Sequence, residues 1–242
     1  MRTTIQGNRK IRVGLKDCWN AFMLEGAEFT DNDIPICPTI LSECPKEILT
    51  WVEAKEIHKK MMRKDKDYFY DAFICFYIDD QCFDGPRSSV WIFPWLAMRT
   101  MKHFRGIITI DFSTFQDFPY PLKLYNTYRM RAFGYWAGTQ GLETINNVRW
   151  GMPDTYQYCF DGIEKDTVVA VGTVGGSPRK IEDRERFEQG LYEMVRRLRP
   201  HTIIVYGSAK YPCFEKLRQE GITIIEYQSK TSRAFERGAQ NE

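Results

Sequence analysis

The sequence predicts an α/β protein with a largely parallel sheet and helices on both of its faces, arranged as an open doubly wound sheet or an incomplete β/α barrel. Two observations carry this prediction. Short, continuously apolar runs alternate with amphipathic segments along most of the chain. The apolar runs, which begin near residues 72, 107, 144, 167, 202 and 222, end in polar or turn-forming residues. Right-handed crossovers suit both arrangements, so the order of the strands stays open.

Helices are predicted between these strands. Pro45 begins the first helix, because proline suits the first helical turn, and Ile48 and Leu49 lie on its apolar face. Further helices are predicted over residues 88–104, 119–139, 182–198 and 211–219. The helix over residues 182–198 has an apolar stripe at steps of three and four, formed by Phe187, Leu191, Met194, Val195 and Leu198.

The 242 residues suit a single domain, and no internal repeat or linker divides them. We expect residues 1–228 to form that domain. Its first 45 residues are predicted to be irregular, because three prolines fall between positions 34 and 45. Residues 229–242 are polar and are predicted to be a disordered tail.

The charge balance excludes a strong overall attraction to nucleic acid or to anionic lipid. The chain has 34 Lys and Arg against 32 Asp and Glu, a formal net charge of +2, although a local basic face stays open. The N-terminus lacks the apolar run of a signal peptide, and no apolar stretch approaches transmembrane length. Seven cysteines without a Cys-x-x-Cys pair favour reduced, mostly buried thiols. We therefore expect a cytoplasmic protein without a membrane partner.

Three carboxylates stand at predicted strand ends. Asp79 and Asp80 follow the strand near residue 72, and Asp111 follows the strand near residue 107. Ligands of parallel α/β folds bind at the carboxyl ends of strands. The three are therefore candidate catalytic residues, with Asp80 and Asp111 as candidate ligands of Mg²⁺. The alternative is structural: Asp79 and Asp80 cap a loop, and Asp111 ends its strand in an Asx turn.

A glycine-rich segment between the strand near residue 167 and the following helix suits an anion. It offers backbone N–H groups, hydroxyls and two basic residues before a helix N-terminus. Its candidate ligand-binding residues are Thr173, Gly175, Gly176 and Ser177. The sequence matches neither the Walker A nor the dinucleotide-binding pattern, and a simple connector is the alternative.

Other strand ends add further candidate ligand contacts, namely Arg149, Trp150, Gly207 and Ser208. Arg129 lies near the apolar stripe of the helix predicted over residues 119–139. It is either a buried ion-pair partner or a ligand contact.

Several of these segments together resemble the DUF4417 family of phage and mobile-element proteins. The similarity covers about residues 34–227. It rests on FYIDD (76–80), IDFS (110–113), YNTYRMR (125–131), NVRW (147–150), YCFDG (158–162), VVAVGTVG (168–175) and TIIVYG (202–207). The resemblance implies a phage or mobile-element origin and a place inside a bacterial host cell. It implies no activity and no catalytic residues, because the function of the family is unknown.

These observations support two main hypotheses. The first is a phage or mobile-element protein that binds a nucleotide or nucleic acid at the strand ends, with Mg²⁺-dependent hydrolase or nuclease activity through Asp111 and Asp80. The second is a protein without an active site that binds and inhibits a host defence factor through aromatic anchors, since aromatics make up 14% of the chain. A sequence-tolerant nucleic-acid binder is a third reading. Whether the protein is an enzyme stays open.

Overall fold

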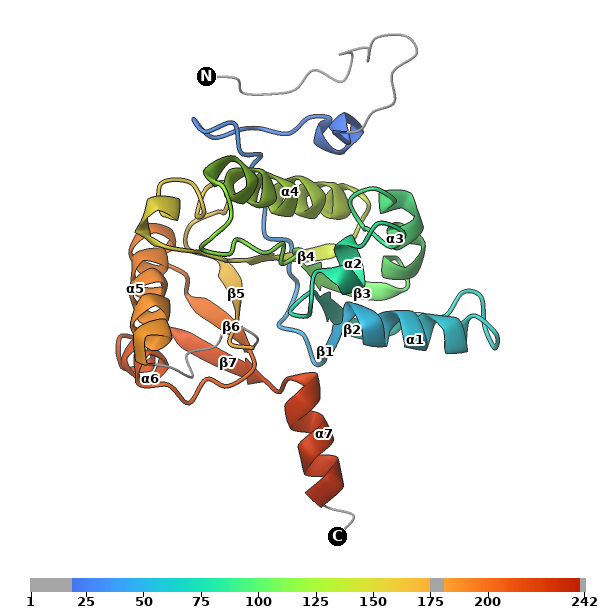
Figure 1. Ribbon diagram of the computed structural model, residues 1–242. Helices are drawn as coiled ribbons and strands as arrows, with labels where there is room; N and C mark the ends of the chain where they lie inside the picture. Colours follow the sequence, from blue (N-terminus) through green and yellow to red (C-terminus); the bar gives the residue numbers. More distant parts are fainter. Residues whose placement is uncertain (1–18, 175–180, 240–242) are drawn as a thin grey trace.

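Seven parallel strands form one sheet whose spatial order follows the chain, β1 to β7 (Figure 1). The structure is a computed structural model and describes residues 19–174 and 181–239. The α/β class and the parallel sheet are confirmed. Of the two predicted arrangements the protein has the incomplete barrel, because a doubly wound sheet reverses its strand order part-way. The strands are β1 Ile48–Thr50, β2 Tyr70–Cys75, β3 Phe104–Ile108, β4 Glu143–Asn147, β5 Val168–Gly172, β6 Thr202–Tyr206 and β7 Thr223–Tyr227.

Helices α1 to α6 pack on the outer face of this curled sheet, whereas the N–H of Lys230 at the start of α7 bonds to the hydroxyl of Tyr206, whose ring faces the interior. The helices are α1 Trp51–Met61, α2 Gln81–Asp84, α3 Pro94–Met101, α4 Tyr120–Thr139, α5 Ile181–Leu198, α6 Pro212–Gln219 and α7 Lys230–Ala239, with short 3-10 turns at Ala21–Leu24 and Pro153–Thr155. Two apolar clusters join outward strand residues to these helices, for example Ile74 to Phe133 and Val169 to Leu191. Consecutive right-handed crossovers place all their helices on one face, which explains this single outer layer.

Among the described residues the inner face lacks the second helical layer that was predicted, and side chains of the sheet and of neighbouring loops fill it instead. The inner cluster contains no residue of α1 to α6; it is formed chiefly by Phe73, Cys75, Tyr77, Ile108, Ile145, Ala170, Ile204 and Tyr206. Tyr77 and Tyr206 stack with their ring centroids 5.5 Å apart. Since these rings come from β6 and from the loop after β2, the curl brings distant strands into contact across the interior.

The prediction that a helix begins at Pro45 is wrong. Ile48–Thr50 form the edge strand β1, paired in parallel with β2 through Ile48 and Phe73. The helix begins only at Trp51, where Thr50 and Glu53 form a capping box. The spacing of Thr50 and Glu53 is a helix-start signal, and it places the helix later than the proline does.

The prediction of a disordered tail over residues 229–242 is also wrong for most of its length, because Lys230–Ala239 form α7. Ser229 caps this helix: its Oγ accepts a hydrogen bond from the N–H of Ser232 at 3.2 Å. Arg233 then binds Glu53 at the start of α1, with 2.8 Å between Nη2 and Oε1. Within the described ranges no helix is long and apolar enough to cross a membrane.

Candidate functional site at the carboxyl edge of the sheet

A buried polar network joins three strand ends at the carboxyl edge. The two oxygens of Asp111 accept hydrogen bonds from Nδ2 of Asn147 at 2.8 Å and from Nη1 of Arg149 at 2.7 Å. The hydroxyl of Tyr77 donates to Oδ1 of Asn147 at 3.0 Å. Asp111 follows β3, Tyr77 follows β2, and Asn147 is the last residue of β4. The network therefore exists because these three strands are neighbours in the sheet.

Asn147 is fixed by its backbone as well as by its side chain. Its N–H donates to Oγ1 of Thr109 at 2.9 Å, and its carbonyl accepts from Nη1 of Arg131 at 3.0 Å. Arg131 is fully buried and also donates to the carbonyls of Cys159 and Asp161. The side-chain amide of Asn147 is thus held rigidly between Tyr77 and Asp111.

An inner hollow of about 110 Å³ opens beside this network. Polar groups of Tyr77, Asp111, Asn147 and Arg149 line it, together with the apolar side chains Val148, Trp150, Val171, Val174 and Phe187 and the backbone at Gly172. A water molecule takes about 30 Å³ of liquid volume, so the inner hollow accommodates a group of a few heavy atoms.

An outer hollow of about 260 Å³ lies next to the inner one and shares Arg149, Trp150 and Phe187 with it. It adds Thr114, Phe115, Gln116, Gly151, Met152, Asp183 and Arg186. The hydroxyl of Thr114 is buried and has no hydrogen-bond partner in the part of the chain that the structure describes. Buried hydroxyls usually have a partner, so Thr114 brings an unpaired hydroxyl to the residues that line the outer hollow.

Tight packing sets the positions of two rings in the inner hollow. A Cβ atom added at Gly190 of α5 would lie 2.1 Å from Nε1 of Trp150, and one added at Gly172 would lie 2.5 Å from the Tyr77 ring. Only glycine leaves room for these rings. Trp150 also lies 5.3 Å from Phe187, measured between ring centroids.

The charges of the network perturb its titration. Burial raises the pKa of Asp111, and the nearby charge of Asp80 adds to the rise, while Arg149 and the hydrogen bond from Asn147 oppose it. Burial, followed by the charge of Asp111, raises the pKa of Tyr77 well above its ordinary value. Tyr77 is therefore a neutral hydrogen-bond donor near neutral pH, and Asp111 is a carboxyl group whose proton affinity is increased.

The other predicted carboxylates make different contacts. Asp79 is exposed and accepts the N–H of Gln81 at 2.9 Å, which is the loop-cap geometry of the structural alternative. Asp80 accepts both the N–H and the hydroxyl of Ser113, at 3.0 and 2.7 Å. Asp80 lies close enough to Asp111 to affect its pKa, but it does not line either hollow.

Arg129 is a buried ion-pair partner, the first of its two readings. Its Nη1 lies 2.8 Å from Oδ2 of Asp84, and its Nη2 donates to Oδ1 of Asn126 at 2.7 Å. The guanidinium also stacks 3.7 Å from the ring centroid of Phe112. Through Phe112 it holds the loop after β3 in place, and it lines neither hollow.

The remaining candidates lie at the ends of β5 and β6. The hydroxyl of Thr173 donates to the carbonyl of Ser208 at 2.9 Å, and Gly207 has a φ of 114° that favours glycine. The bond joins the two strand ends, and Thr173 directly follows Gly172, which lines the inner hollow. Gly175, Gly176 and Ser177 lie outside the described residues.

The residues near Asp111 do not fit Mg²⁺. Mg²⁺ prefers near-octahedral oxygen coordination, yet both oxygens of Asp111 and both of Asp80 accept hydrogen bonds from protein donors. A guanidinium already lies beside Asp111. Within residues 19–174 and 181–239, no group of three or more His, Cys, Asp or Glu could hold a metal ion. Binding of Mg²⁺ by Asp80 and Asp111 stays a prediction that no contact in the described residues supports.

A family model describes most of this chain. The model for DUF4417, a domain of unknown function, matches residues 38–228. The chain belongs to the DUF4417 family. This match confirms the resemblance drawn from the sequence and covers every residue that lines the two hollows.

Among curated relatives, this DUF4417 protein is similar to the Gene 1 proteins of Mycobacterium phages L5 and D29. It is 32% identical to each over 136 residues, which is 56% of this chain and 57% and 48% of the two relatives. The aligned part thus spans about half the length of each phage protein. No solved structure matches the chain. It is a phage-related protein whose function its family leaves open.

Proposed function

We propose that the protein binds a phosphate-bearing ligand, a nucleotide either free or within a nucleic acid, in the two hollows at the carboxyl edge of the sheet. The supporting observation is the position of Arg149. Its side chain is 29% exposed, borders both hollows together with Trp150 and Phe187, and has its guanidinium 6.0 Å from the ring centroid of Phe115. A partly exposed cation next to partly exposed aromatic rings suits a phosphate joined to a base.

Arg149 retains donors for a ligand. Its Nη1 bonds to Asp111, and a guanidinium carries five N–H donors. Arg186, on the outer hollow, is 44% exposed and pairs only loosely with Asp183 at 3.7 Å and with Glu182 at 4.0 Å. Surface pairs of this kind contribute little, so Arg186 is able to exchange them for a phosphate.

The aromatic side chains form the proposed site for the nucleobase of the ligand. Trp150 and Phe187 line both hollows, and Phe115, which is exposed, lines the outer one. Stacking of one base on an aromatic ring contributes about 1–3 kcal/mol and tolerates any sequence. The inner hollow accepts a small polar group that reaches Tyr77 and Asn147, and the hydroxyl of Thr114 contacts the part of the ligand in the outer hollow.

Turnover is a further part of this proposal. Asp111 is the carboxylate that borders the ligand, and its raised pKa suits proton transfer. Hydrolase or nuclease activity would use Asp111 as the proton acceptor for an attacking water, with Asp80 acting on it through its charge. Because free nucleotides and host nucleic acid occur there, the cytoplasm of a bacterial host is the compartment that we propose for this function.

A thermal-shift screen of the purified protein tests the binding. The ligands are nucleoside mono- and triphosphates, cyclic dinucleotides, and short single-stranded DNA and RNA, each with Mg²⁺ and with EDTA. A ligand at 100 times its Kd stabilises the native state by about 2.7 kcal/mol, which gives a clear shift. Comparison of the free nucleotides with the oligonucleotides shows whether the ligand is a free nucleotide or part of a nucleic acid.

Two variants locate any ligand that is found. Arg149→Ala and Trp150→Ala should each abolish most of the shift, whereas Arg218→Ala, an exposed arginine on α6, should leave it unchanged. A shift that survives both site variants would place the ligand elsewhere. The absence of a shift with every ligand would refute the proposal. Asp111→Asn should keep binding and abolish any cleavage that accompanies it.

A further inference from the structure

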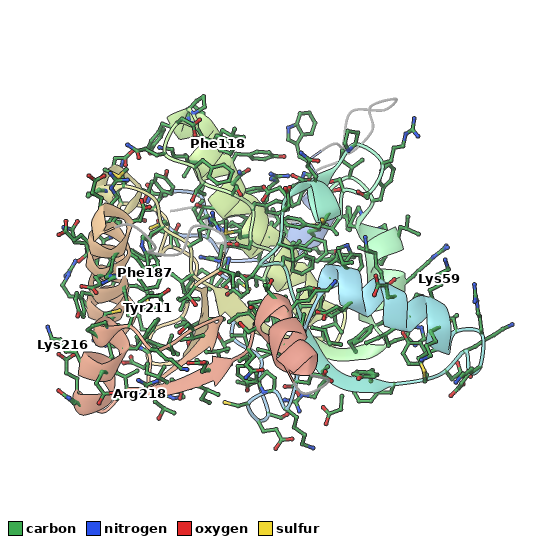
Figure 2. All side chains as sticks on the ribbon, turned by 60° about the horizontal axis from the view of Figure 1, so that its bottom comes forward. Lys59, Phe118, Phe187, Tyr211, Lys216 and Arg218 are labelled. Carbon is green, nitrogen blue, oxygen red and sulfur yellow. The ribbon has the colours of Figure 1, made fainter. Side chains whose placement is uncertain are left out.

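A third hollow, of about 190 Å³, lies between α1 and the segment that leads into α3. It is lined by Trp51, Lys55, Arg87, Ser88, Ser89, Val90, Phe93, Leu96, Ala97 and Thr100. It shares no residue with the hollows at the carboxyl edge. Figure 2 places α1, which carries the labelled Lys59, on the opposite side of the molecule from Phe187. We call this hollow, with the exposed apolar residues beside it, the α1–α3 surface.

Trp51 brings an unpartnered donor to this hollow. The side chain is only 4% exposed, and its Nε1 is buried without an acceptor among the residues that the structure describes. A buried indole N–H normally has a hydrogen-bond partner. An acceptor on a bound molecule would supply the missing bond, so this donor points to a ligand.

Exposed apolar side chains continue the α1–α3 surface beyond the hollow. Four of the five residues from 92 to 96 are large, apolar and 43% to 60% exposed, namely Ile92, Phe93, Trp95 and Leu96. Phe22 stacks on Trp95 with the ring centroids 5.5 Å apart and is itself 38% exposed. Clustered apolar residues of this size on a surface mark a site of protein contact.

The charges decide what kind of partner fits. The lining of the hollow includes Lys55 and Arg87 and no acidic residue. Neither cation forms an ion pair within the described parts of the chain. A second copy would bring the same basic side chains. Residues 1–18 of this chain carry five basic residues and one acidic residue, so they too would be repelled.

We propose that the α1–α3 surface docks an acidic segment of another protein. One large apolar side chain of that segment enters the hollow between Phe93 and Leu96. A carbonyl or carboxylate oxygen accepts the N–H of Trp51, and flanking acidic residues pair with Lys55 and Arg87. Because this surface shares no lining residue with the inner and outer hollows, the inference does not depend on nucleotide binding.

Selection from a displayed library of random peptides tests the proposal, with counter-selection on the Leu96→Asp variant. The enriched peptides should carry a large apolar residue flanked by Asp or Glu. A synthetic, fluorescein-labelled copy of the strongest peptide is then titrated by fluorescence anisotropy. Enriched peptides that are neutral or basic, or no enrichment over the counter-selection, would overturn the proposal.

Matched variants identify the contacts. Leu96→Asp and Arg87→Glu should each weaken the synthetic peptide about tenfold or more, as loss of an interface anchor does. Trp51→Phe replaces the indole with a smaller aromatic ring that has no N–H, and should weaken binding by several-fold. Phe69 is an apolar residue that is 63% exposed and does not line this hollow, so Phe69→Ala should leave binding unchanged. Equal binding of the peptide by all four variants would contradict the proposal. A concentration-dependent dimer that Leu96→Asp dissociates would contradict it as well.

Discussion

Arg149 and Asp111 form an ion pair that joins the ends of two neighbouring strands, with 2.7 Å between Nη1 and Oδ2. The two partners differ in their access to solvent, because the Asp111 side chain is 8% exposed and that of Arg149 is 29% exposed. The pair therefore connects the buried network around Asn147 to the surface of both hollows. Any ligand that binds Arg149 also changes the electrostatic environment of Asp111.

The stability of the protein should depend on pH through Asp111. Its pKa is raised in the folded state, so its stabilising contribution is complete below the unfolded pKa of 3.8 and is lost as the pH rises through the folded pKa. Asp111→Asn cannot titrate. The free energy of unfolding of the wild type, relative to that of Asp111→Asn, should thus fall as the pH rises from below 3.8. Urea unfolding of both proteins over a pH series measures this difference.

Arg149→Ala provides the control for that experiment. Arg149 lowers the pKa of Asp111, so its removal should move the pH-dependent loss of stability to higher pH. If the free energy of unfolding of the wild type differed from that of Asp111→Asn by the same amount at every pH, the pKa of Asp111 would not be raised.

Gly190→Ala should disturb the proposed nucleobase site at Trp150 and Phe187 more than it disturbs the fold. The new methyl group would lie 2.1 Å from Nε1 of Trp150, so the indole has to move. Overpacking of this kind costs about 1–3 kcal/mol, and the better helix propensity of alanine offsets about 1 kcal/mol. We expect a modest fall in melting temperature, a change in tryptophan fluorescence, and about tenfold weaker binding of any ligand found in the thermal-shift screen.

Gln189→Ala is the matched control, since Gln189 is an exposed neighbour on the same helix. It should change neither the fluorescence nor the binding. If Gly190→Ala also left both unchanged, Trp150 would not be held by the close approach of α5.

The thiols should differ sharply in reactivity. Burial raises the pKa of Cys37, Cys75 and Cys159 to about 12, so these thiols are almost never thiolates at pH 8. Cys44 and Cys82 are partly exposed. Iodoacetamide followed by mass spectrometry should label Cys44 and Cys82 long before Cys37, Cys75 and Cys159. Equal labelling in urea confirms that burial is the cause, and fast native labelling of Cys75 would contradict it.

Much of the fold is readable from local pattern. Each of the six predicted strands is present within a few residues, because buried parallel strands are continuously apolar and stand between amphipathic helices. Asp111 was likewise predictable as a strand-end carboxylate. β1 was not, because its three residues gain their strand conformation from pairing with β2, and Ile48 and Leu49 suit a helix equally well by themselves.

The partners of Asp111 depend on information that no local pattern holds. Asn147 reaches Asp111, and Tyr77 reaches Asn147, only because β2, β3 and β4 are adjacent, and the sequence leaves the strand order open. The ring positions of Trp150 and Phe187 depend on how closely α5 approaches the sheet at Gly190. A glycine within an otherwise regular amphipathic helix was the one sequence signal for that contact.

The contact between Arg233 and Glu53 should stabilise the barrel where its sheet is open. Arg233 of α7 also donates to the carbonyl of Ile48 in β1 at 3.3 Å, so it joins the last helix to the first strand. Arg233→Ala should lower the free energy of unfolding by about 1–2 kcal/mol, since hydrogen bonds to charged groups contribute on this scale. Arg218→Ala, at an exposed surface pair, should cost little by comparison.

This loss should itself depend on pH. Although burial raises the pKa of Glu53, the hydrogen bonds from Thr50 and Arg233 outweigh burial and leave that pKa below its ordinary value of 4.5. The stabilisation is therefore present above 4.5 and disappears as the pH falls through the folded pKa. Urea unfolding should show a large difference between wild type and Arg233→Ala at neutral pH and a small one in acid. A difference that stays constant as Glu53 becomes protonated would mean that Arg233 acts through the carbonyl of Ile48 instead.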